Sequence, residues 1–172
     1  ALMVPDIELQ LQVVSAALRN VAAQACQGGS LAGEQMGLSI VTLDQVRALL
    51  PVRRRIARAE LDAAIAMAED LAAIVPGDDL AVGLARAVAV HGDVDADAGE
   101  ADAARLALSE ALASVADSLP AGERGKAAMR VILSHSRRAI DIARACCLPA
   151  GFEVDPAEQQ RLATVRENLL AG

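Results

Sequence analysis

His135 is the first side chain to consider for chemistry, because an imidazole titrates near neutral pH. The helix expected over residues 123–147 turns by about 100° per residue, so it carries one narrow polar face. That face is formed by Arg130, Ser134, Arg137, Asp141 and Arg144. His135 lies at the edge of the opposite, apolar arc, with Arg138 beside it. We predict that His135 packs at the core boundary, hydrogen-bonded to a neighbouring helix.

An alternative function for His135 is that of a phosphoacceptor. His135 with Arg138 three residues later resembles the arrangement in histidine phosphotransfer domains, in which a histidine exposed on a helical bundle has a cation nearby; the run here is His135-Ser136-Arg137-Arg138-Ala139. The resemblance implies that Arg138 steadies the phosphoryl group. That family usually has a glycine just after the histidine, and Arg137 stands here at an expected apolar position. Exposure separates the two interpretations, because a phosphoacceptor must reach solvent.

A second candidate site is the acidic loop that contains Asp93, Asp95 and Asp97. Alternating aspartates resemble the start of an EF-hand, which binds calcium through oxygen ligands. Ala98 stands where that loop needs its turn glycine, and Ala104 stands where it needs a bidentate glutamate. We therefore expect a solvated acidic turn whose last aspartate caps a helix. A weak calcium or magnesium site is the alternative.

The densest positive charge is the run Arg53-Arg54-Arg55 with Arg58. It opens a predicted helix, where cations oppose the helix dipole. One interpretation is a patch that binds an anion or an acidic partner. We favour pairing with Glu60, Asp62 and acidic residues of neighbouring helices, because the whole chain has a formal net charge of −7.

The remaining patterns argue against common catalytic sites. The cysteines, Cys26, Cys146 and Cys147, form no CxxC pair, and an odd number is a poor disulfide framework. Neither histidine has a glutamate three residues before it, which excludes the di-iron ligand pattern of helical bundles. We expect reduced thiols, no cofactor, no metal and no catalytic residue other than the alternative at His135.

Composition limits the fold and the partners. The chain has 172 residues, 54% of them hydrophobic, with no Trp, no Tyr and one Phe. A length of this order suits one domain, and the high apolar content with a modest net charge excludes disorder. An acidic chain with almost no aromatic residues is a poor nucleic-acid binder. No leader pattern and no apolar run of membrane-spanning length are present, so we expect a cytoplasmic protein without membrane contact.

Alanine makes up roughly a quarter of the sequence, and Lys126 is the only lysine. Alanine favours helices, whereas strands favour β-branched and aromatic residues. The alanine and arginine bias also suggests a GC-rich bacterial genome. The spacing predicts an all-α, up-down bundle in one domain, 1–172, with two or three short flanking helices. The four long helices are expected at 5–27, 53–75, 98–118 and 123–147.

Local signals set the expected ends of these helices. Residues 28–41 contain few helix signals and are expected to be a connection, with Ile40-Val41 extended. Capping boxes are expected at Thr42 with Gln45, at Asp97 with Glu100, and at Asp155 with Glu158. Asp78 or Asp79 is expected to cap a shorter helix at about 79–91.

Apolar seams predict what packs inside. On the helix expected at 5–27 they are Ile7, Leu11, Val14, Leu18, Val21 and Ala25; on the helix expected at 53–75 they are Ala57, Leu61, Ala64, Ala68, Leu71 and Val75. Further apolar side chains remain, such as Met67, Met129, Ile132 and Leu133. We therefore predict a homodimer through a helix-pair face. The expected function is a non-enzymatic, regulatory or adaptor-type protein that acts by protein–protein association.

Overall fold

The computed structural model describes residues 7–25, 31–151 and 153–171, and every regular element in these ranges is helical. The all-α prediction is confirmed, since the described residues contain no strand. The helices are α1 (Ile7–Ala25), α2 (Leu31–Leu49), α3 (Arg53–Ile74), α4 (Asp78–Gly92), α5 (Ala98–Asp117), α6 (Glu123–Cys147) and α7 (Pro156–Ala171). Two 3₁₀ turns, η1 (Leu50–Val52) and η2 (Leu148–Ala150), follow α2 and α6.

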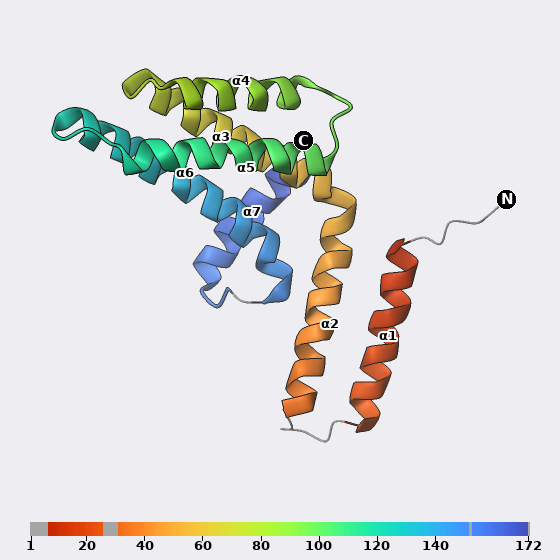
Figure 1. Ribbon diagram of the computed structural model, residues 1–172. Coiled ribbons are helices and arrows are strands. Elements are labelled where there is room, and N and C mark those ends of the chain that lie inside the picture. The colour runs from red at the N-terminus through yellow and green to blue at the C-terminus, as the bar shows by residue number, and fades with distance from the viewer. Residues whose placement is uncertain (1–6, 26–30, 152, 172) are drawn as a thin grey trace.

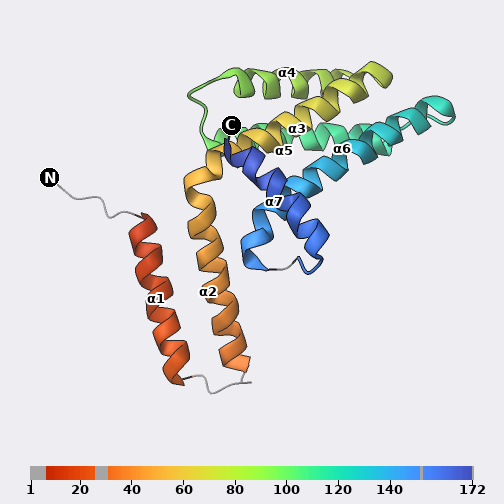
Figure 2. The same cartoon turned by 180° about the vertical axis from the view of Figure 1, so that it is seen from behind.

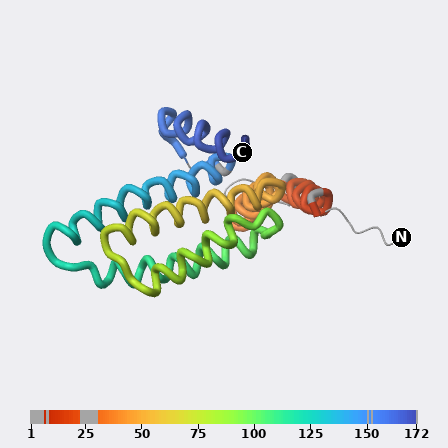
Figure 3. Tube along the Cα trace, turned by 90° about the horizontal axis from the view of Figure 1, so that it is seen from above, coloured from red at the N-terminus to blue at the C-terminus, as the bar shows by residue number. Residues whose placement is uncertain are grey.

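The central helix of the body is α3, which packs against α4, α5 and α6. Seen from above, α6 lies on one side of α3 and the α4–α5 pair on the other (Figure 3). Successive helices from α3 to α6 run in alternating directions, and α7 lies against α6 and α3 (Figure 1). The predicted seam of α3 is buried from Ala57 to Leu71, with Val75 partly buried at its end.

Helices α1 and α2 form an antiparallel hairpin that projects from this body (Figures 1 and 2). The segment 5–27 was expected among the four bundle helices, but α1 packs on α2, and α4 packs with α3 and α5. The chain changes direction at η1, where Pro51 cannot continue the α2 hydrogen-bond ladder. Of the α1 seam, Leu11 and Leu18 are half-buried, whereas Ile7, Val14 and Val21 are exposed.

The prediction that residues 28–41 connect two helices is wrong, because α2 already begins at Leu31. Thr42 does not cap a helix there. Its Oγ1 donates to the carbonyl oxygen of Leu38 at 2.8 Å, as a hydroxyl inside a helix does. Gly37 weakens a helix by about 1 kcal/mol, but α2 continues through it without a break.

The capping box of α5 is confirmed. Asp97 Oδ1 accepts from the Glu100 amide at 2.9 Å, and Glu100 Oε2 accepts from the Asp97 amide at 2.8 Å. At α7, Asp155 accepts from the Ala157 amide at 3.0 Å, but Glu158 binds arginines instead of completing the box. The N-cap of α4 is Gly77 with no side-chain bond, so Asp78 and Asp79 lie in the first turn and act on the helix dipole.

Candidate functional site

His135 extends from α6 toward α3. Its Nε2 lies 2.8 Å from Asp70 Oδ2, and its side chain is 16% exposed, against 63% for Asp70. The nearby cation Arg138 pairs with Asp62 of α3 at 3.1 Å. The hydrogen bond to a neighbouring helix is thus in place. The phosphotransfer function stays a prediction, since it concerns transfer of a group to His135.

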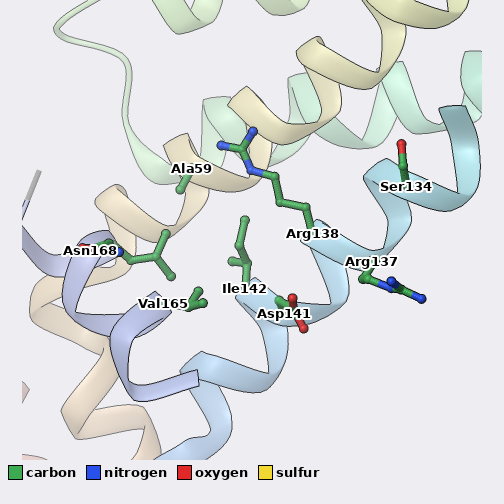
Figure 4. Close-up of a pocket in the computed structure, with 9 residues that line it drawn as sticks. Ala59, Ser134, Arg137, Arg138, Asp141, Ile142, Val165 and Asn168 are labelled. Carbon is green, nitrogen blue, oxygen red and sulfur yellow. The ribbon is translucent and has the colours of Figure 1, made fainter. Parts of the chain in front are cut away.

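A groove of about 530 Å³ lies beside these residues, between α3, α6 and α7. Its apolar lining is Ala59, Ile142, Val165 and Leu169. Arg138 extends from α6 toward α3, while Arg137 extends away from the groove (Figure 4). Among the lining polar groups, Ser134 donates to the Val131 carbonyl oxygen, and Asp141 accepts from Arg161. The groove can hold an apolar group, but it does not assemble a nucleophile with a base.

Five charged residues fasten α7 to α6. Arg161 binds both carboxylate oxygens of Asp141 at 2.7 Å and Glu158 at 2.9 Å. Arg144 reaches Glu158 at 3.1 Å and also pairs with Glu153. The hydrogen bonds from Arg161 lower the pKa of Asp141 and of Glu158, and the bond from Arg144 lowers the pKa of Glu153. These charges hold two helices together.

The arginine cluster at the start of α3 serves a structural purpose. Arg53 pairs with Asp102 of α5, as the prediction of neighbouring acidic partners required. The others bind backbone carbonyls: Arg54 that of Val94, Arg55 that of Leu170, and Arg58 those of His91 and Asp93.

The expected partners of that cluster, Glu60 and Asp62, pair instead with Arg105 and Arg138. The arginines of the cluster bind backbone carbonyls because the last carbonyls of a helix have no donor within that helix. Arginines beside the ends of α4 and α7 supply such donors. The guanidinium groups of the cluster are therefore engaged within the chain.

Two aspartates of the acidic loop accept hydrogen bonds from backbone amides. Asp93 Oδ1 accepts from the Asp95 amide at 2.9 Å, and Asp97 caps α5. Within the ranges that the structure describes, no three acidic, histidine or cysteine side chains gather closely enough to hold a metal ion. Two of the three candidate ligands, Asp93 and Asp97, thus accept hydrogen bonds from backbone amides, and cation binding by this loop stays a prediction.

Both described cysteines are free thiols at the end of α6. Cys146 is buried, and desolvation raises the pKa of its thiol. Cys147 accepts a hydrogen bond from Gln45 Nε2 of α2 at 3.4 Å, which links the hairpin to the body. Cys26 lies outside the described residues.

The sequence did not single out Arg105 of α5. Its Nε is buried, lies 3.5 Å from Glu60 Oε2 and makes no hydrogen bond. It lines a crevice of about 260 Å³ between α3, α5 and α6, with walls that include Ala139 and Ala143. The small residues Ala139 and Ala143 of α6 are the sequence signal for this crevice. Small residues alone do not identify the helices between which a crevice opens.

Exposed apolar side chains gather on two surfaces. The first is the hairpin, whose large exposed members are Ile7, Leu9, Val13, Val14, Val21, Leu31, Leu38, Val41 and Val46. The second is the outside of α6, with Met129 and Leu133. Met67 and Ile132, which were also expected to be left over, pack partly against the core. No described helix has the length and apolar character needed to span a membrane.

Comparisons with protein-family models, with curated proteins and with solved structures found no match. The residues of the two apolar surfaces are therefore the basis for a proposed function.

Proposed function

We propose that this chain acts by protein–protein association, and that its α1–α2 hairpin binds the hairpin of a second copy. The observation that carries the proposal is the exposed apolar surface of the hairpin. In this proposal α3 to α6 form an up-down bundle in which α4 takes the place expected for residues 5–27, and this bundle is the body from which the hairpin projects. The function is regulatory or adaptor-like rather than catalytic.

Two helices alone cannot enclose a core. Helix α2 has no buried residue, and Ser15 is the buried residue among the described side chains of α1. Ser15 is also polar and donates to Asp44 at 3.0 Å. Most helical stability in proteins comes from packing of an apolar face. A second hairpin would supply two more helices, so that the four enclose a core.

The size of the hairpin fits a stable dimer. A helix of 19 residues is about 28 Å long, and two side by side are about 20 Å across. A face of these dimensions approaches a standard interface, which buries roughly 800 Å² per partner. The hairpin also carries little net charge, because Arg19 and Arg47 nearly balance Glu8, Glu34 and Asp44. Two copies can therefore meet without strong repulsion, and two-fold homodimers are the commonest assembly.

Sedimentation equilibrium of the full chain tests this function. We compare the wild type with the double variant Val14→Glu, Leu38→Glu, which places charges on the hairpin. The matched control is Val82→Glu, Leu106→Glu, because both residues are exposed on α4 and α5. Wild type and control should be dimers, and the hairpin variant a monomer with unchanged helicity of the body. A monomeric wild type, or a hairpin variant that still dimerises, would overturn the proposal.

A further inference from the structure

A second association surface runs along the outside of α6. Met129, Leu133, Ser136 and Ile140 follow 4-3-4 spacing, which is the seam pattern of a coiled coil. Leu133 is 63% exposed, Ile140 56% and Met129 42%, and Ser136 is partly exposed. We call these four residues the α6 seam. Large apolar side chains in a row at this exposure indicate a surface that a partner covers.

Positive charge lies along one side of the α6 seam. Arg130 and Arg137 are one heptad apart and exposed, and neither makes an ion pair or a hydrogen bond within the described part of the chain. The neighbouring carboxylates are already engaged. Asp141 binds Arg161, and Glu158 binds Arg144 and Arg161. Arg137 attracts Asp141 only at longer range. The face therefore offers two guanidinium groups that no described carboxylate approaches to ion-pair distance.

The α6 seam also borders a hollow. A groove of about 640 Å³ lies between α6 and the first half of α7, and its lining includes Leu133, Arg137 and Ile140. A concave seat of this kind fits the side chains of a helix better than it fits a flat membrane surface. Met129 and Ile140 are about 16 Å apart along a helix axis. That length corresponds to roughly three turns of a partner helix.

We propose that the α6 seam docks an amphipathic helix of a partner protein, with apolar residues at heptad spacing and acidic residues beside them. Charge complementarity identifies this partner. A second copy of the same face would bring Arg130 and Arg137 close to their own counterparts, which is unfavourable. The inference rests on the association function proposed above, but it uses a different surface.

Two synthetic helical peptides of about four heptads serve as probes, each labelled with fluorescein. They share one apolar seam and differ in the flanking positions, which are glutamate in one and lysine in the other. Fluorescence anisotropy with the full chain should show the acidic peptide binding at least about tenfold more tightly than the basic one. Added salt should reduce that difference, because the arginines are exposed.

The charge-reversed variant Arg130→Glu, Arg137→Glu should exchange the preference and bind the basic peptide more tightly. The matched control is Arg86→Glu, an exposed change on α4 that should keep the preference of the wild type. Equal binding of both peptides, no binding of either, or a reversed variant that still prefers the acidic peptide would each overturn the proposal. So would binding to phosphatidylserine vesicles together with failure to bind either peptide.

Sedimentation equilibrium separates this proposal from the dimer. The variant Arg130→Glu, Arg137→Glu should have the same mass as the wild type, because its changes lie outside the hairpin. A dimeric wild type that binds the acidic and the basic peptide equally well would overturn the α6 inference alone. A monomeric wild type that still selects the acidic peptide would overturn the hairpin dimer alone.

Discussion

Gly125 allows α6 to begin close to the turn that precedes it. A Cβ at this buried position would lie 1.9 Å from the carbonyl oxygen of Pro120, a backbone atom that cannot move aside alone. Gly83 of α4 is different, because a Cβ there would meet Leu108 Cδ1 at 3.5 Å, an ordinary contact. A side chain at position 125 would therefore clash with the backbone, whereas position 83 has room for a methyl group.

We predict that Gly125→Ala lowers the free energy of unfolding by about 1–3 kcal/mol, as overpacking does. Gly83→Ala should raise it by about 0.5–1 kcal/mol, because alanine is the better helix former. Urea denaturation followed by circular dichroism measures both. Equal midpoints for Gly125→Ala and the wild type would show that the turn at Pro120 adapts freely.

His135→Ala tests the packing interpretation of this histidine. We expect a loss of about 1 kcal/mol, because the side chain is mostly buried while water can take over its bond to the exposed Asp70. Chemical denaturation gives the value. The phosphotransfer alternative predicts another result: unchanged stability, together with loss of labelling by a phosphorylated receiver domain. Arg138→Ala would then weaken the labelling too.

At the scale of elements, the ion network between α6 and α7 makes stability depend on pH. The carboxylates of Asp141, Glu153 and Glu158 have lowered pKa values in the folded chain because arginines bind them. A lowered folded pKa gives a contribution that is fully present above the unfolded pKa of about 4. That contribution is lost as the pH falls through the lower, folded value.

We predict that the melting temperature of the wild type falls between about pH 5 and pH 3, and falls less steeply in Arg161→Ala. This variant removes the principal partner of Asp141 and Glu158. Arg166→Ala is the matched control on α7, because Arg166 makes no ion pair within the described residues. Thermal unfolding by circular dichroism at a series of pH values measures the slopes. Parallel curves for wild type and Arg161→Ala would contradict this account of the network.

Elements with strong local signals could be predicted from the sequence. Helix α6 has the predicted bounds, and α5 begins at its capping box, because caps and seams depend on residues close in sequence. The first part of α2 was missed because residues 28–41 contain few local helix signals, yet one continuous helix runs from Leu31 to Leu49. The targets of Arg54 and Arg55 could not be predicted, since residues distant in sequence provide them, in the loop after α4 and at the end of α7.

For the whole molecule, the sequence indicated more apolar surface than one chain can bury. The heptad spacing of α1 predicted packing, but periodicity does not identify the helix that covers a seam. In the structure α2 covers only part of it, and Ile7, Val14 and Val21 remain exposed. On α6 the sequence likewise indicated that Met129 and Leu133 are apolar side chains beyond those needed for the core. It did not indicate that Ile140 and the flanking arginines lie on the same surface.

The mass of the wild-type chain in solution tests the central claim most directly. Multi-angle light scattering behind size-exclusion chromatography measures it over the micromolar range, at low and at physiological salt. The hairpin dimer predicts twice the 17.7 kDa chain mass, with little effect of salt because the contact is apolar. A mass of 17.7 kDa at every concentration would contradict the claim that a second copy covers α1 and α2.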